Sequence, residues 1–365
     1  MKPKYLSITS FPAVLIFIFL WPHCDSATDG MEGSNFEWSF STPVSEKIDP
    51  VQLDSAFVAA ENTGYMDALL VVQNGRLIRE SYFNGYHEDD PHNVMSVSKS
   101  FLSVIAGVAH EMGYISNLDT AVLDYFPEYI TPNMDNRKYD ITLRHLLTMQ
   151  MGIASESDNS YELYMELYNS DDWIAETLDL PLISAPGEAM HYNTFQTHLL
   201  SAVITRAAGC NTLKFARQHL FEKMKIDCDQ WEKGPQGYYF GGNSMYFTPR
   251  EMAVLGLLVL NRGLIDDEQL ISEKWIDLML TKTRPADAPA WGVLRDYNYG
   301  YLWWLGKIND FQLFMALGYG GQTVLVFPEL DLIVVTTANE NIMPDVDHER
   351  PILDIVSRYI LPSLF

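Results

Sequence analysis

The pattern of apolar and polar positions is clearest in two short runs, at residues 69–72 and 77–82. Both runs are rich in apolar residues, and Asn74-Gly75 stands between them. Asn-Gly between two such runs favours a two-residue turn, because both central positions of that turn have positive φ. The pattern therefore predicts an antiparallel β-hairpin over residues 69–82.

Further along the chain, the apolar spacing is helical from residue 96 to residue 112, and helical patterns dominate as far as about residue 281. Strand patterns return near the C-terminus. The remaining elements that we expect are strands at 311–316, 323–327 and 332–337 and helices at 51–61 and 352–361.

Strands at both ends of the chain, with helices between them, predict an α+β fold. We expect one antiparallel sheet, closed by the N- and C-terminal segments and flanked by helices, with a mainly helical lobe inserted. The α/β lobe should comprise about residues 50–100 and 285–365, and the helical lobe about residues 101–284.

The N-terminus has the pattern of a secretory signal peptide. Lys2 and Lys4 precede an apolar run at 11–21, which is too short to cross a bilayer comfortably. We therefore expect residues 1–27 to be a signal peptide, with Cys24 as a possible lipid-anchor site, and residues 28–365 to be the exported domain. The protein should be periplasmic or secreted.

The composition narrows the function. The chain has 365 residues, of which 47% are hydrophobic, so it can bury a large core. Its 24 Lys and Arg residues stand against 48 Asp and Glu residues, giving a net charge of −24. A surface this acidic repels phosphate backbones and anionic lipids, which argues against nucleic-acid binding and against a membrane contact beyond the N-terminal anchor. Acidic loop runs such as 156–158 are expected to be solvated.

Metal and nucleotide sites have no support in the sequence. There is no HExxH or CxxC spacing and no Walker A or GxGxxG loop, so we expect no metal and no organic cofactor. Export would permit a disulfide between Cys210 and Cys228, but a helical pattern over 213–224 would hold them apart. We favour two unpaired thiols, and the sequence leaves their pairing open.

One short motif has nucleophile chemistry. Ser96-Val97-Ser98-Lys99 stands where the pattern changes from loop to helix. Residues three apart share a helix face, so the Lys99 amine can reach the Ser96 hydroxyl. The helix N-terminus stabilises a developing oxyanion and disfavours a protonated lysine. The alternative is an exposed serine cap beside a solvated lysine.

The segment 93–101, which contains this motif, resembles the nucleophile segment of the serine β-lactamase-like family. That family includes class C β-lactamases, D-Ala-D-Ala carboxypeptidases, and many esterases and amidases. Other segments resemble later motifs of the family, in the family's order: 141–152, 186–192, 248–253, a recurring strand at 299–304, and the third motif at 318–322. Within this family, the sequence most resembles the branch of 6-aminohexanoate-dimer hydrolases and related esterases. The resemblance covers roughly residues 50–365.

The resemblance implies a β-lactamase/transpeptidase-like fold and a set of catalytic residues. Ser96 would be the acylated nucleophile, Lys99 its proton acceptor, and Tyr192 a second base or acid. The backbone N–H groups of Ser96 and Tyr319 would form the oxyanion hole. Tyrosine can act as a base only if cationic neighbours lower its pKa, so the three side chains must cluster.

Two departures from the family pattern bear on the substrate. The family's Y-x-N motif is Tyr192-Asn193-Thr194 here, so Asn193 or Gln196 would have to supply the amide. Where the family has K-T-G or H-T-G, this chain has Ala316-Leu317-Gly318, without the cation and hydroxyl that bind a substrate carboxylate. Gly318 and Trp303 are further candidates for substrate contact.

We therefore expect an exported serine hydrolase that cleaves a neutral ester or amide in a small-molecule or peptide-like substrate, through an acyl-enzyme. The alternatives are a β-lactamase or D,D-carboxypeptidase acting on peptidoglycan-type substrates, and a non-catalytic member that binds a ligand. The natural substrate, ester or amide preference and oligomeric state are not predicted.

Overall fold

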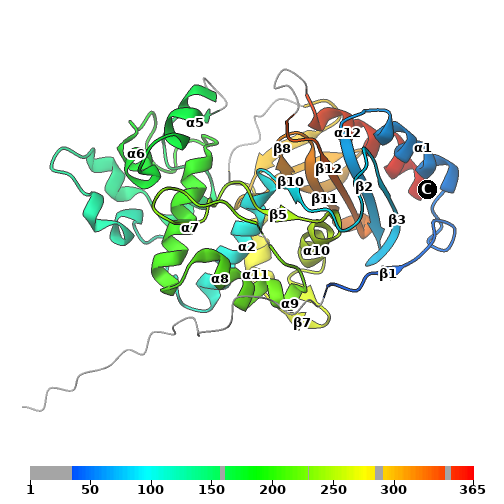
Figure 1. Ribbon diagram of the computed structural model, residues 1–365, viewed down its shortest axis with the longest axis horizontal. Coiled ribbons are helices and arrows are strands. Elements are labelled where there is room, and N and C mark those ends of the chain that lie inside the picture. The colour runs from blue at the N-terminus through cyan, green and yellow to red at the C-terminus, as the bar shows by residue number, and fades with distance from the viewer. Residues whose placement is uncertain (1–34, 157–160, 229, 284–290, 342–346) are drawn as a thin grey trace, which may run out of the picture.

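The computed structural model describes residues 35–156, 161–228, 230–283, 291–341 and 347–365 (Figure 1). Its central element is an eight-stranded sheet with the order β1-β3-β2-β12-β11-β10-β9-β8. Every neighbouring pair is antiparallel except β1 and β3, which run parallel. The strands are β1 (Ser39–Phe40), β2 (Met66–Gln73), β3 (Arg76–Tyr82), β8 (Arg295–Tyr299), β9 (Trp304–Ile308), β10 (Phe311–Gly318), β11 (Gln322–Phe327) and β12 (Leu332–Ala338).

The predicted hairpin is present as β2 and β3. Asn74 and Gly75 both have positive φ, 53° and 70°, and Gln73 pairs with Arg76 across the turn. On its other edge β2 pairs with β12, so the sheet is closed by N- and C-terminal segments. The predicted antiparallel sheet is therefore confirmed.

Helices cover both faces of the sheet. On one face lie α1 (Pro50–Glu61) and α12 (Glu349–Ile355), the latter followed by a π-helical turn η6 (Val356–Ile360) and η7 (Leu361–Leu364). On the other face lie α2 (Val97–Glu111) and α10 (Pro249–Leu260). Successive residues of the central strands alternate between two hydrophobic clusters, as Val71 and Val72 do in β2. Because both faces are covered, nearly every residue of β2, β11 and β12 is buried.

A helical lobe lies beside the sheet, with α2 between them (Figure 1). Its main helix is α7 (Thr194–Ala208), which packs against α2. The other helices of this part of the chain are α3 (Leu143–Leu147), α5 (Tyr161–Tyr168), α6 (Trp173–Asp179), α8 (Thr212–Ala216), α9 (Glu222–Met224) and α11 (Glu273–Met279), with short helical turns η1 (Val122–Tyr125), η2 (Pro127–Tyr129), η3 (Asn136–Asp140) and η4 (Arg217–Phe221). A further helical turn, η5 (Pro328–Leu330), lies between β11 and β12 of the sheet. Two small hairpins pair β4 (His92–Asn93) with β5 (Tyr246–Phe247) and β6 (Leu264–Ile265) with β7 (Glu268–Gln269).

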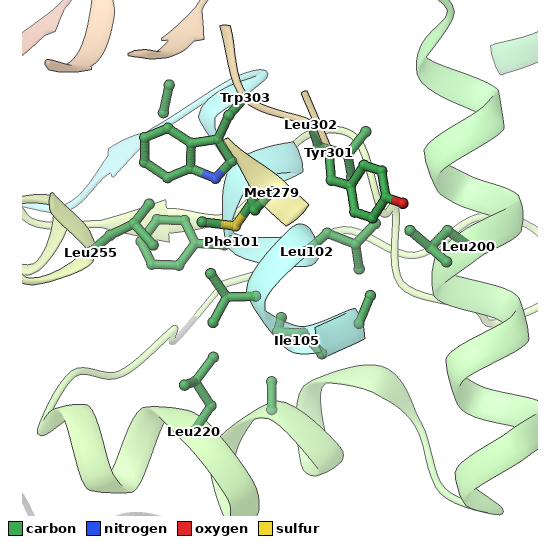
Figure 2. Close-up of a cluster of buried hydrophobic side chains, with 14 of the residues drawn as sticks. Phe101, Leu102, Ile105, Leu200, Leu220, Leu255, Met279, Tyr301, Leu302 and Trp303 are labelled. Carbon is green, nitrogen blue, oxygen red and sulfur yellow. The ribbon is translucent and has the colours of Figure 1, made fainter. Parts of the chain in front are cut away.

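Helix α2 is buried on every side, because it contacts both the sheet and the helical lobe. Residues 97–109 of this helix are all buried. Figure 2 shows Phe101, Leu102 and Ile105 of α2 among side chains from several other elements. A helix buried all round cannot shift without disrupting the core, so it is a rigid support for the residues at its N-terminus.

Residues 299–304, expected as one strand, instead comprise the last residue of β8, a turn at 300–303 and the first residue of β9. Gly300 N–H bonds to the Trp303 carbonyl at 2.9 Å, and Leu302 has φ of 59°. The hydroxyls of Ser100 and Ser103 on α2 bond to carbonyls of this turn at 2.8 and 2.6 Å. The turn is thereby docked on α2, which fixes the positions of Trp303 in the turn and of Trp304 at the start of β9.

Two predictions on the periphery have different outcomes. The signal peptide at residues 1–27 lies outside the described residues, and within those residues no helix is long and apolar enough to cross a membrane. Cys228 is a free, buried thiol, whereas Cys210 is disulfide-bonded, so these two cysteines do not pair with each other. The expectation of an unpaired thiol was therefore wrong for Cys210.

Candidate active site

Ser96 stands at the N-cap of α2, on a segment with a sharp turn. The residue before it, Met95, has φ of 50°, in the left-handed region that non-glycine residues rarely adopt. The turn is held by the Asn93 side chain, which accepts from Met95 N–H at 3.1 Å, and by Val94 N–H, which donates to the Met245 carbonyl at 2.9 Å. The result is a half-buried serine at the end of a rigid helix.

Lys99 lies one helical turn further on and is 1% exposed. Its Nζ donates to Ser96 Oγ at 2.8 Å, to Thr194 Oγ1 at 3.0 Å and to the Gly242 carbonyl at 2.8 Å. Burial lowers the pKa of Lys99 to about 8, against the opposing effect of Glu156. A lysine with this pKa is partly neutral near physiological pH, and a neutral amine beside a serine hydroxyl can accept its proton.

Tyr192 completes the cluster from the loop before α7. Its hydroxyl is hydrogen-bonded to the Ser96 side chain, and its ring lies 4.9 Å from Lys99 Nζ. Burial, together with the negative charge of Glu156, raises the pKa of Tyr192. The sequence reasoning required a lowered pKa for a tyrosine base. Because the phenol instead keeps its proton, Tyr192 suits the role of an acid that donates it.

Strand β10 brings the third predicted motif to Ser96. It pairs with β9 over 311–315 and with β11 over 314–318, so the last residues of β10 have no β9 partner. A Cβ on Gly318 would lie 2.5 Å from the Val94 carbonyl, so only glycine allows this close approach. Tyr319 follows at once and is 37% exposed, with its ring 5.4 Å from that of His348. An oxyanion hole formed by Ser96 and Tyr319 stays a prediction.

The predicted amide side chains do not lie at Lys99. Asn193 and Gln196 are both fully buried. Asn193 caps α7 and donates to the Ala154 carbonyl at 3.1 Å, and Gln196 accepts from Met151 N–H at 3.0 Å. Both therefore hold the loop in place, and neither is free to contact a substrate.

Thr194 contacts Lys99 where the sequence predicted the side-chain amide of Asn193 or Gln196. It is the third residue of the Tyr192-Asn193-Thr194 segment, and its hydroxyl accepts from Lys99. The same hydroxyl donates to Glu156 at 2.5 Å. The position of Thr194, two residues after Tyr192, is the feature of the sequence that could have identified it as a site residue. No such feature identified Glu156, because the sequence places it in an acidic run that was expected to be solvated.

The two adjacent tryptophans have different environments. Trp303, a candidate for substrate contact, is fully buried in the core around α2 and is left no surface for a ligand (Figure 2). Trp304 stacks against Tyr192 at 5.7 Å between ring centroids, and against Tyr297 at 4.8 Å. The prediction was therefore wrong for Trp303, and Trp304 is the tryptophan next to the site.

The family model described as "Beta-lactamase" matches residues 63–357. The 6-aminohexanoate-dimer hydrolase of Paenarthrobacter ureafaciens is 24% identical over 298 residues, which are 77% of this chain and 74% of that protein. EstCE1, described as a hydrolase with promiscuous acyltransferase activity, has a similar structure, with a TM-score of 0.71 and 15% identity over 87% of this chain and 100% of its own. A penicillin-binding protein from Bacillus halodurans gives a TM-score of 0.64 and 17% identity, over 85% of this chain and 100% of its own.

The match to the family model spans most of the chain, so this protein belongs to the β-lactamase family. It is a serine hydrolase of the β-lactamase-related class, with the β-lactamase/transpeptidase-like fold. Within the described residues, no group of three or more His, Cys, Asp or Glu side chains is placed to hold a metal ion.

Proposed function

We propose that this protein hydrolyses a neutral ester or amide through an acyl-enzyme formed on Ser96. The observation that carries the proposal is the convergence of Ser96, Lys99 and Tyr192, which come from two distant segments of the chain. A protein that only bound a ligand would have no need for a buried lysine of lowered pKa beside a serine hydroxyl.

In the acylation step, neutral Lys99 takes the proton of Ser96 as Ser96 Oγ forms a bond to the substrate carbonyl carbon. The carbonyl electron pair moves to the oxygen, which the N–H groups of Ser96 and Tyr319 stabilise. When the tetrahedral intermediate collapses, the bond to the leaving group breaks. Tyr192 gives that group its proton and is reprotonated from Lys99. A water molecule then repeats the sequence on the acyl-enzyme and releases the acid.

The preference for a neutral substrate rests on the charges near the site. Ala316 and Leu317 are buried, apolar and unable to pair with a carboxylate. The charged groups that act on Tyr192 are Glu156 and Glu349, and both are acidic. A carboxylate bound here would be desolvated and would have these negative charges as neighbours, which costs several kcal/mol.

A panel of four substrates tests this proposal: p-nitrophenyl acetate, a linear amide, a D-Ala-D-Ala peptide and nitrocefin. We expect kcat/KM for p-nitrophenyl acetate to exceed that for the two carboxylate-bearing substrates by roughly 100-fold or more, given the cost of an unpaired buried charge. Nitrocefin turnover as fast as ester turnover would instead favour the β-lactamase alternative. A chain that gains no mass from a fluorophosphonate would favour the non-catalytic one.

Export is a separate part of the proposal. It is supported by the lysines and the apolar run of the first 27 residues. N-terminal sequencing of the protein purified from an expressing cell should find that the chain begins near residue 27 or 28. Recovery of intact Met1 from a secretion-competent host would contradict it.

A further inference from the structure

The hydrogen bonds around Lys99 Nζ have fixed directions at two of its three partners. The Gly242 carbonyl can only accept. The Thr194 hydroxyl has one proton, and that proton goes to Glu156 Oε1, so Thr194 Oγ1 must accept from Lys99. The third partner, Ser96 Oγ, can either accept or donate.

Glu156 decides the direction at Thr194. Its Oε1 accepts from the Thr194 hydroxyl at 2.5 Å, and its Oε2 accepts from Thr194 N–H at 2.9 Å. Its own N–H donates to the Tyr192 carbonyl at 3.0 Å. An ionised carboxylate has no proton to donate, so the Thr194 hydroxyl cannot turn its own proton toward Lys99.

We propose that Glu156 is a positioning residue which, through the Thr194 hydroxyl, keeps the lone pair of neutral Lys99 directed at Ser96. The inference rests on the proposed function, in which Lys99 is the base. A neutral amine keeps two N–H bonds. The Gly242 carbonyl and Thr194 Oγ1 can only accept, so these two bonds point at them. The lone pair is left facing the Ser96 hydroxyl, which is the arrangement that proton transfer requires.

The titratable groups facing Nζ give the inference a signature in pH. They are Glu156, from the segment before α5, and Tyr192, from the loop before α7, while Gly242 and Thr194 carry no charge. The negative charge of Glu156 raises the pKa of Lys99, in opposition to burial. Removing that charge should therefore move the rise of activity with pH to lower pH, an effect that a purely structural residue would not have.

Glu156→Gln is the direct test, because it keeps the size of the side chain and removes its charge. The glutamine oxygen can accept from Thr194 N–H, which leaves its NH₂ group facing the Thr194 hydroxyl and donating to it. That hydroxyl can then donate to Lys99 and draw the lone pair away from Ser96. We expect kcat/KM for p-nitrophenyl acetate at its high-pH plateau to fall roughly 10- to 100-fold, which is part of the 10²–10⁴ that a placed base supplies. The midpoint of the profile should move to lower pH.

A pair of variants at Thr194 tests the same relay without touching the charge. Thr194→Val keeps the shape and loses the hydroxyl, so we expect a loss in kcat/KM similar to that of Glu156→Gln. Thr194→Ser keeps the hydroxyl and should recover most of that loss. Glu162→Gln, on the exposed face of α5, is the matched control for net charge and should have the wild-type profile.

The outcomes separate the positioning role from the proposed function. A Glu156→Gln enzyme with the wild-type plateau and midpoint would overturn the inference, as would equal activity of Thr194→Val and Thr194→Ser. If Glu156→Gln does not fold, the Thr194 pair decides alone. Lys99→Arg is assayed in parallel. An active Lys99→Arg enzyme refutes the proposed mechanism itself, whereas an inactive one beside an unaffected Glu156→Gln refutes only the role of Glu156.

Discussion

The two sides of the site are built in different ways. Ser96 and Lys99 lie on one turn of one helix, three residues apart, and their contact follows from helical geometry. The groups on the other side of Lys99 come from three separate segments, which contribute Glu156, the Tyr192–Thr194 loop and Gly242. The nucleophile side is thus local, and the supporting side exists only in the folded chain.

This difference shows which side of the site can be built from different residue types. Around Ser96 the spacing is dictated by the helix, so the motif can be found in the sequence. On the supporting side, any group that accepts a hydrogen bond can be a partner of the Lys99 amine. In this protein a threonine hydroxyl, held by a carboxylate, takes the place of the amide in the family's Y-x-N motif. We expect perturbations of the two sides to differ in size and in pH dependence.

The largest effect should come from Ser96→Ala. Loss of the nucleophile should remove covalent labelling by a fluorophosphonate and lower kcat/KM by about 10⁴-fold or more. Ser98→Ala is the control, because Ser98 is fully buried and its hydroxyl accepts from Met245 N–H instead. Intact-mass spectrometry reads out the label. Labelling that survives in Ser96→Ala but not in Ser98→Ala would identify Ser98, and not Ser96, as the nucleophile.

Lys99→Arg should lower kcat/KM by roughly 10³-fold, within the range of a placed general base. Arginine keeps its proton at any working pH. In the wild type, burial lowers the pKa of Lys99 to about 8, so activity should be low below pH 8, where the amine is protonated, and should rise through pH 8 as it becomes neutral. A pH–rate profile of each enzyme measures the activity lost in Lys99→Arg and the rise of wild-type activity with pH. Lys223→Arg, at an exposed lysine paired with Glu268, should behave as wild type, and a flat wild-type profile would argue against Lys99 as base.

Tyr192→Phe should have an effect that depends on the leaving group. The raised pKa of Tyr192 makes it a proton donor, and a donor matters most when the leaving group is a poor one. We expect roughly a 100-fold loss of kcat for a linear amide and a much smaller loss for a p-nitrophenyl ester, whose leaving group departs as an anion. Tyr129→Phe, which loses only a bond to Asp172, is the control. Equal losses on both substrates would contradict the acid role.

The smallest effect on activity should come from the tryptophan pair. Trp304→Ala removes a ring stacked on Tyr192, a contact worth about 0.5–1.5 kcal/mol, so kcat/KM should fall about 2- to 12-fold. Trp303→Ala instead opens a cavity in the core and should lower the free energy of unfolding by about 3–5 kcal/mol. Urea denaturation and ester kinetics measure the two effects. If Trp303→Ala mainly lowered activity and Trp304→Ala mainly lowered stability, then Trp303 and not Trp304 would be the tryptophan at the site.

Much of the fold was predictable because its signals are short-range. Asn74-Gly75 specifies the hairpin through two positive φ angles, and the apolar spacing after Ser96 specifies α2 to within a residue at each end. The strand patterns near the C-terminus gave β10, β11 and β12 nearly to their observed bounds. The turn at 300–303 was not predictable. Its apolar residues look like a strand, and contacts with the hydroxyls of α2 bend it.

The sequence by itself determined the β2–β3 hairpin, the buried helix and the placement of Ser96 and Lys99 on one helical turn, because each depends on residues close together in the chain. Only the tertiary structure decided which groups surround Lys99. A hydroxyl at Thr194 and a carboxylate at Glu156 resemble ordinary polar loop residues until folding brings them to one buried amine. It also decided that Trp304 and not Trp303 lies at the site, since Trp303 is fully buried in the core while Trp304 stacks on Tyr192. Burial is a property of the whole fold, and it is burial that lowers the pKa of Lys99 and raises that of Tyr192.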